Sequence, residues 1–216
     1  SCVVEISSEY GIKSIIYESP LEYTSTDKLL QFSLKLGLCA QYYIGETGAI
    51  YACPKNKIHK TLLEKYAKFT GKKQIYGTDY EIAKSISKPA KILLLVEESE
   101  IDYVLTLAKE EFKDEFHIIR GSPIPFFIEF LSPQTNKGNG LKQLCLKRNI
   151  PLDSVVSFGD GDNDEEFLRY AGLGIAMKNA QPIAKSAANM VLEWTNDEDG
   201  VARQLERMER QGLLDL

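Results

Sequence analysis

Apolar and polar positions follow their most regular pattern in the last third of the chain. Short apolar runs alternate there with stretches whose apolar residues recur at helical spacing. The pattern predicts strands at Val155–Phe158, Gly174–Met177 and Met190–Leu192, and helices at Gly138–Arg148, Glu165–Ala171, Gln181–Ala188 and Gly200–Arg210. Alternation of strands and helices is typical of a parallel sheet covered on both faces, so we predict an α/β fold for this part of the chain.

The first fifty residues carry a looser version of the same pattern. Cys2–Ile6 and Ile12–Ile16 are strand-like, and Gln41–Ile44 predicts a further strand. Thr26–Leu36 has apolar residues at helical spacing, and Gly37 follows it, as glycine often follows a helix. We assign this part to the same domain as the last third.

The middle of the chain has helices and strands of its own. The pattern predicts helices at Ile58–Phe69, Asp79–Ile86 and Glu100–Phe112, the last with Ser99 as N-cap, and strands at Lys91–Val96, Phe116–Arg120 and Phe126–Leu131. The last two strands flank GSPIP, a hairpin-like turn. We therefore predict an α/β domain at residues 52–130, inserted into a core domain made of residues 1–51 and 131–216.

Composition places the chain among ordinary globular proteins. It has 216 residues, 44% of them hydrophobic and 26% charged, and no apolar run long enough to span a membrane. The start lacks the features of a secretory signal, and the four cysteines form no CxxC pair, so we expect a cytoplasmic protein with reduced thiols. His59 and His117 lack partners at ligand spacing and are interpreted as structural residues.

Charge bears on the partners. The net charge of −5 argues against a nucleic-acid surface, although a local basic patch would survive such an average. Lys55–Lys73 is dense in lysine, but no aromatic stacking platform accompanies it, and a solvated helix face explains it more simply. We expect neither a nucleic-acid nor a membrane partner.

An acidic turn follows the predicted strand Val155–Phe158. Asp160, Asp162 and Asp164 stand close together there with Asn163 between them. A turn at the carboxyl edge of a parallel sheet is where open α/β folds bind ligands, and carboxylate oxygens suit Mg²⁺. The alternative is an acidic turn that only caps the following helix.

A lysine opens the helix that precedes this strand. In TNKGNGL, Lys137 stands before glycine at the predicted helix start. A lysine at that position can reach a phosphate bound at the helix N-terminus. By itself, the segment is more simply explained by a solvated lysine in a loop.

The segments TNKG, SFGDGDND, GIAMKNA and NDEDGVA, in this order, resemble the haloacid dehalogenase superfamily. The closest group is the Cof-type phosphatases with an α/β (C2-type) cap domain. The resemblance implies a Rossmann-like parallel-sheet core with an inserted α/β cap. It also implies a Mg²⁺-dependent phosphatase of small phosphorylated metabolites, sugar phosphates or similar compounds.

The resemblance also suggests roles for matching positions. Lys137 resembles the catalytic lysine that holds the transferring phosphoryl group, with Asn136 and Asn179 also on the phosphate side. Asp160 resembles the direct Mg²⁺ ligand. Asp164 and Asn163 resemble the residues that complete the metal site, and Asp162 is left out because its position varies in the group.

The chain departs from the family at the nucleophile. The family attacks phosphorus with an aspartate in a DxDGT turn, and this chain contains no DxDGT. Tyr17, Glu18 and Ser19 stand where the family has Thr-Gly-Arg. Glu5 has a strand before it, but a longer side chain would misplace the attacking oxygen by ~1 Å, which can cost ~100-fold in rate.

Two functional hypotheses therefore stand side by side. In the first, the complete protein is a phosphatase, and these 216 residues lack one of its segments. In the second, the chain is a catalytically dead relative that keeps the fold and part of the anion site as a binding or regulatory protein. Under both, we expect little or no phosphatase activity from these 216 residues alone.

Overall fold

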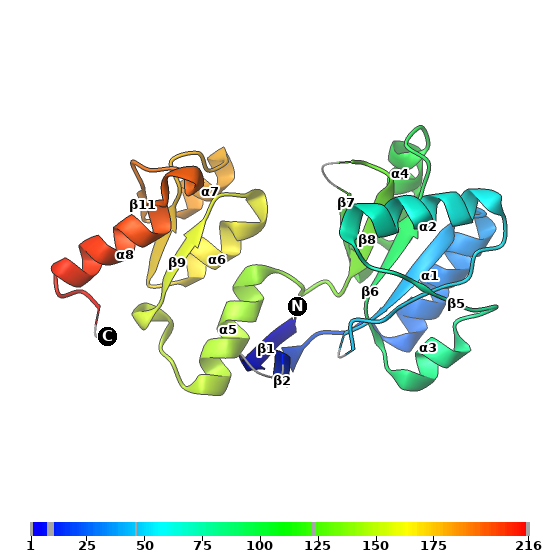
Figure 1. The fold of residues 1–216 in the computed structure, drawn as a ribbon, viewed down its shortest axis with the longest axis horizontal. Helices are drawn as coiled ribbons and strands as arrows, with labels where there is room; N and C mark the ends of the chain where they lie inside the picture. The colour runs from blue at the N-terminus through cyan, green and yellow to red at the C-terminus, as the bar shows by residue number, and fades with distance from the viewer. Residues whose placement is uncertain (1, 8–10, 46, 122–123, 215–216) are drawn as a thin grey trace. The chain divides into compact units, whose positions relative to one another are not determined.

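The computed structural model describes residues 2–7, 11–45, 47–121 and 124–214, with backbone only up to residue 15. The chain divides into two compact units (Figure 1). The first unit is Ser1–Cys2 with Ile6–Thr135, and the second is Val3–Glu5 with Asn136–Leu216. β1 (Cys2–Ser7) and β2 (Gly11–Glu18) pair in a two-stranded sheet.

The first unit is built on a mixed sheet with the strand order β5-β4-β3-β6-β8-β7. Its strands are β3 (Cys39–Ile44), β4 (Ile50–Ala52), β5 (Ile75–Tyr76), β6 (Pro89–Leu95), β7 (His117–Arg120) and β8 (Phe127–Leu131). Only β4 and β5 pair in parallel; the other neighbours are antiparallel. The predicted hairpin of β7 and β8 is confirmed.

Helices cover both faces of this sheet. They are α1 (Tyr23–Lys35), α2 (Lys57–Thr70), α3 (Glu81–Ile86) and α4 (Ile101–Phe112). Along β6, Ile92 and Leu94 pack with α1, α3 and α4, whereas Leu93 and Leu95 pack with α2 on the opposite face. Burial on both faces explains why the sequence of β6 is continuously apolar.

Local capping chemistry agrees with the sequence at two helices and differs at a third. Gly37 follows α1 with φ +64°, the left-handed conformation that glycine adopts without strain. At α2, the Asn56 side chain accepts a hydrogen bond from the His59 amide at 2.8 Å. The prediction of Ser99 as N-cap of α4 was wrong, since Glu100 precedes the first helical residue and its side chain caps nothing.

The predicted start of the inserted domain, residue 52, also needs correction. β3 and β4, which we placed in the core domain, pair with the strands of the middle block, because β3 runs antiparallel to β6 along its whole length. α1 packs on the same sheet. Residues 23–52 therefore belong to the first unit. Its sheet is distinct from the sheet that contains β9, as predicted.

The second unit has the predicted alternation of strands and helices. β9 (Val156–Gly159), β10 (Leu173–Ala176) and β11 (Met190–Val191) form a parallel sheet with β10 in the centre. The helices are α5 (Lys137–Arg148), α6 (Glu165–Tyr170), α7 (Pro182–Ala187) and α8 (Gly200–Arg210). Its core joins Leu168 of α6, Ile175 of β10, Ala184 of α7 and Met208 of α8.

No helix in the described part of the chain is both long and apolar enough to cross a membrane. Both histidines bond to backbone groups, His59 to the Gly37 carbonyl and His117 to the Thr135 carbonyl, which fits their interpretation as structural residues. Cys39, Cys53 and Cys145 are free and buried.

Candidate functional site

Two loops meet at the carboxyl edge of the parallel sheet in the second unit. β9 ends at Gly159, which lies opposite Ala176 at the end of β10. The amide of Met177 donates to the Gly159 carbonyl at 3.0 Å, and the amide of Gln181 donates to the Asp160 carbonyl at 2.8 Å. These bonds hold the acidic turn against the loop that carries Asn179.

Asp164 is the buried centre of the acidic turn. Only 4% of its surface is exposed, and its Oδ2 accepts hydrogen bonds from the amides of Asp160 at 2.9 Å and Gly161 at 3.0 Å. A Cβ on residue 159 would lie 2.5 Å from the Asp164 Cβ, so the turn can fold back this tightly only after glycine. Asp164 therefore determines the conformation of the loop that presents Asp160.

The other carboxylate oxygen of Asp164, Oδ1, accepts a hydrogen bond from the Lys137 ammonium. Burial alone would raise the pKa of the Asp164 carboxyl, but the Lys137 ammonium and the two amides outweigh it and lower the pKa below its usual value. Asp164 is thus ionised at neutral pH. The Lys137 side chain is half exposed, so it is both anchored and accessible to a ligand.

The position of Lys137 follows from the first turn of α5. Asn136 caps this helix, because its side chain accepts a hydrogen bond from the Asn139 amide at 2.7 Å. Next to the lysine, a Cβ on Gly138 would lie 2.5 Å from the Glu166 Cβ and 2.7 Å from its backbone carbon. Glycine therefore allows α5 to approach α6 closely enough for Lys137 to reach Asp164.

The structure adds Asn196, which our sequence analysis did not single out although it lies in the segment NDEDGVA. Asn179 Nδ2 donates to Asn196 Oδ1 at 2.8 Å, and the Asn196 amide donates to Asn179 Oδ1 at 3.3 Å. Asn196 Nδ2 lies 3.5 Å from Asp160 Oδ2. Asn196 thus connects Asn179 with Asp160, and its place in NDEDGVA, one of the segments that carry the family resemblance, is the sequence signal that could have indicated it.

The acidic turn supplies some of the oxygen ligands that a Mg²⁺ site requires. In the described parts of the chain, no three His, Cys, Asp or Glu side chains are placed to share a metal ion. Both oxygens of Asp164 are already engaged, whereas the Asp160 carboxylate is exposed, and its only side-chain contact among the described residues is Asn196 at 3.5 Å. The accessible Asp160 carboxylate fits Mg²⁺, which usually takes one or two protein carboxylates and keeps several waters.

The remaining candidates differ in what the structure says of them. Asn163 is exposed, and its Oδ1 lies over Gly161, 2.8 Å from where a Cβ would stand. The Glu5 side chain lies outside what the structure describes. Glu18 packs against Gly45, and Ser19 Oγ donates to Ser132 Oγ at 2.8 Å, both within the first unit.

The second unit is thus a parallel α/β sheet that carries an acidic, lysine-paired loop at its carboxyl edge. The family model of haloacid dehalogenase-like hydrolases matches residues 6–205. The chain belongs to this family.

Named relatives and solved structures agree with this assignment. YxeH of Bacillus subtilis is 27% identical over 194 residues, which cover 90% of this chain and 69% of YxeH. The 5-amino-6-(5-phospho-D-ribitylamino)uracil phosphatase YitU of the same organism is 42% identical over 78 residues, 36% of this chain and 28% of YitU.

Among solved structures, a haloacid dehalogenase-like hydrolase from Bacteroides thetaiotaomicron has a TM-score of 0.72 at 25% identity, covering 91% of this chain and 70% of that one. TM0651 from Thermotoga maritima has a TM-score of 0.77 at 24% identity, covering 94% and 72%. These likenesses confirm the predicted Rossmann-like α/β fold of the family.

Proposed function

We propose that this protein is a Mg²⁺-dependent phosphatase of small phosphorylated metabolites such as sugar phosphates. The observation that carries the proposal is the Lys137–Asp164 pair beside the accessible Asp160 at one sheet edge. Such a site offers a fixed cation and a hard oxygen ligand within one loop system. The phosphatase YitU, similar over part of the chain, supports the same reaction class.

In this proposal each residue has a separate task. Lys137 binds the phosphoryl oxygens and stabilises the charge that develops on them. Asp164 keeps Lys137 in place and holds the turn, while Asn196 and Asn179 orient the carboxylate of Asp160. Mg²⁺ bound through Asp160 would supply further charge neutralisation at the phosphoryl group. The first unit would act as the cap that selects the leaving group.

The attacking group is the part of the mechanism that these residues leave open. The 216 residues contain no DxDGT segment, so none of the residues at this edge is assigned as nucleophile. The lack of a DxDGT segment in these residues favours a second function. In it, the chain is a binding or regulatory protein that holds a phosphorylated ligand without hydrolysing it. Both functions require the anion and metal sites, so these are tested first.

The metal site is tested by calorimetric titration with Mg²⁺. Asp160→Ala is expected to lose most of the binding heat, because it removes the accessible carboxylate that we assign to the metal. Asp162→Ala is the matched control, since Asp162 is exposed and belongs to the same turn. Equal heats for wild type and Asp160→Ala would exclude Asp160 as a ligand.

The anion site is tested with inorganic phosphate in the presence of Mg²⁺. Lys137→Met should weaken binding by about tenfold or more, as expected for loss of a charge-assisted hydrogen bond. Lys147→Met, exposed on the same helix, should bind as wild type does. Unchanged binding by Lys137→Met would contradict the proposed phosphoryl site.

Turnover tests whether these 216 residues supply the attacking group themselves. We expect the chain to hydrolyse p-nitrophenyl phosphate far more slowly than ~1 s⁻¹, an ordinary enzyme rate. Binding without turnover is the result expected under both functions, because no nucleophile is assigned among these 216 residues. Turnover at ~1 s⁻¹ or faster would mean that a residue of this chain attacks phosphorus, and Glu5→Gln and Glu18→Gln would then be the first variants to identify it.

A further inference from the structure

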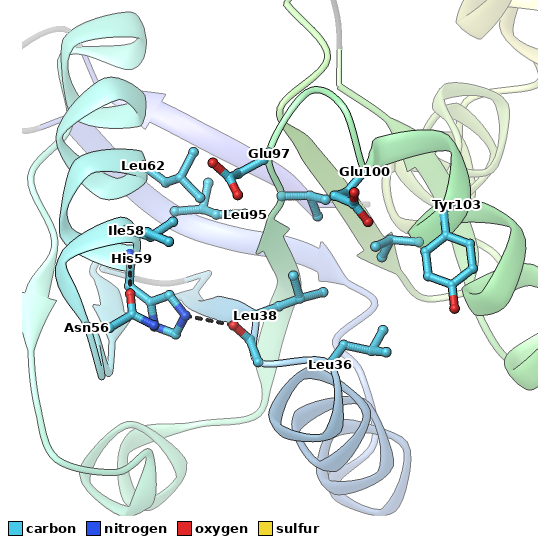
Figure 2. Close-up of a pocket in the computed structure, with 13 residues that line it drawn as sticks. Leu36, Leu38, Asn56, Ile58, His59, Leu62, Leu95, Glu97, Glu100 and Tyr103 are labelled. Carbon is cyan, nitrogen blue, oxygen red and sulfur yellow. Dashed lines mark hydrogen bonds between the residues drawn. The ribbon is translucent and has the colours of Figure 1, made fainter.

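The first unit contains a pocket of about 210 Å³ that no part of the proposed phosphatase mechanism uses. It lies where α1 ends and where α2 and α4 begin, next to the last residue of β6 (Figure 2). Its volume exceeds the ~150 Å³ of a cavity known to take up benzene. A ligand with one small ring or a short aliphatic chain therefore fits.

The wall of the pocket is mostly apolar. Aliphatic side chains from the segment after α1, from α2, from β6 and from α4 line it: Leu36, Leu38, Ile58, Leu62, Leu95 and Val104. Ile58 is 53% exposed and Tyr103 is 60% exposed, so the pocket opens onto apolar surface. Burial of an apolar ligand body in it is favourable because it removes this surface from water.

His59 belongs to the lining but carries no charge. Its Nδ1 accepts a hydrogen bond from the Lys55 amide at 3.2 Å, so the proton must be on Nε2, which donates to the Gly37 carbonyl at 2.8 Å. Figure 2 shows this ring held between Asn56 and the end of α1. With both nitrogens engaged, His59 is a structural part of the wall.

Two carboxylates make the electrostatic potential at the pocket negative. Glu97 and Glu100 line it, no lysine or arginine does, and neither carboxylate has an ion pair among the described residues. Figure 2 shows both side chains at the space between α2 and Tyr103. Glu98, between them in sequence, pairs instead with Lys65 and lies outside the lining.

The partial charges at the nearby helix ends do not change the sign of this potential. The last turn of α1 adds partial negative charge, and the first turns of α2 and α4 add partial positive charge of about half an elementary charge each. Together they leave a partial positive charge of about half an elementary charge, which is screened by water and is smaller than the charge of the two carboxylates. Two full carboxylate charges therefore dominate the potential at the pocket.

We propose that this pocket binds a small organic cation, an ammonium group carried on an apolar ring or chain. The apolar body fills the space between Leu38, Leu62 and Leu95, while the ammonium lies between Glu97 and Glu100. Tyr103 also lines the pocket, and an aromatic ring can make a further favourable contact with a cation. This site is formed by residues of the first unit, and the proposal does not depend on the phosphatase function.

The probe for the test is phenethylammonium, titrated by calorimetry and by ligand-observed NMR. Its uncharged analogue 2-phenylethanol and its anionic analogue phenylacetate have a similar apolar body. We expect phenethylammonium to bind about tenfold more tightly than 2-phenylethanol, and phenylacetate more weakly than either. Raising the salt concentration from about 0.05 M to about 0.5 M should weaken binding of phenethylammonium but not binding of its two analogues.

A double variant tests whether Glu97 and Glu100 form the binding site for the cation. Glu97→Gln with Glu100→Gln should bring the affinity for phenethylammonium down to that for 2-phenylethanol, a loss of about tenfold. Glu98→Gln is the matched control, which removes one charge from the same loop and should leave affinity unchanged. Because these glutamates are exposed, the variants should fold as wild type does, which a thermal melt checks.

Each of the following results would overturn the proposal. They are equal affinity for the cation and the alcohol, unchanged affinity in the double variant, and no binding of phenethylammonium at about 10 mM. An equal loss in Glu98→Gln and the double variant would also overturn it, because it would show a diffuse charge effect instead of a site.

Discussion

A single carboxylate, Asp164, organises the candidate site at the scale of residues. Its two oxygens together accept hydrogen bonds from the Lys137 ammonium and from the amides of Asp160 and Gly161. Hydrogen bonds to a charged group contribute about 1.5–3 kcal/mol each, more than neutral ones. The same interactions that stabilise the loop therefore also place the lysine that we propose for phosphate.

We expect Asp164→Asn to lower the free energy of unfolding by about 1–2 kcal/mol at pH 7, because it removes the charge that Lys137 and the amides stabilise. The folded pKa of Asp164 lies below its usual value, so this stabilisation is complete above about pH 4 and is lost as the pH falls through the folded pKa. Urea unfolding from pH 7 to pH 2 measures the difference between the two proteins.

Asp162→Asn is the control for this prediction. Asp162 is exposed in the same turn, so its replacement should change the unfolding free energy by less than about 0.5 kcal/mol at every pH. A difference between wild type and Asp164→Asn that stays constant down to pH 2 would contradict the ionised, stabilised carboxylate.

At the scale of elements, the approach of α5 to α6 decides whether the site exists. Intrinsic propensity disfavours glycine inside a helix by about 1 kcal/mol relative to alanine. Gly138 nevertheless stands in the first turn of α5, buried against the backbone of Glu166. The close contact between the helices outweighs the propensity, because any larger residue would separate them.

Gly138→Ala is therefore expected to destabilise the protein by about 1–3 kcal/mol, the cost of overpacking, and to weaken phosphate binding by displacing Lys137. Lys147→Ala, exposed on the same helix, should have an effect below about 0.5 kcal/mol. Denaturant unfolding and phosphate titration of the two variants measure this. A more stable Gly138→Ala would show that helix propensity decides at this position and that the contact is loose.

At the scale of the whole molecule, the chain carries two sets of hydrophobic clusters, each built on its own sheet. Leu94 belongs to a cluster of the first unit, and Ile175 belongs to a cluster of the second. Proteins made of more than one compact unit commonly unfold in more than one step. Stability is then a property of each unit, and a core substitution should act on the unit that contains it.

We expect two transitions in a calorimetric melt. Leu94→Ala should lower one of them and Ile175→Ala the other, each corresponding to about 2–5 kcal/mol for a buried aliphatic side chain reduced to alanine. A single transition that both substitutions lower by the same amount would show that the units unfold together.

Local periodicity in the sequence determined most of the elements. The helices α1, α2, α5 and α8 were predicted within a few residues, because apolar spacing records which face of an element is buried. The parallel pairing of β9, β10 and β11 followed from their alternation with helices. The order of the segments TNKG and SFGDGDND indicated the family.

Only the tertiary structure decided which sheet each strand joins and which side chains meet. A strand such as β3, buried along its whole length, has the same apolar pattern in either sheet, so its pairing with β6 depends on partners distant in sequence. The same holds for Asn196, which reaches Asp160 across 36 residues. The amino-acid sequence thus determined the elements and the chemistry of the loops, whereas long-range packing decided the domain boundary and the geometry of the site.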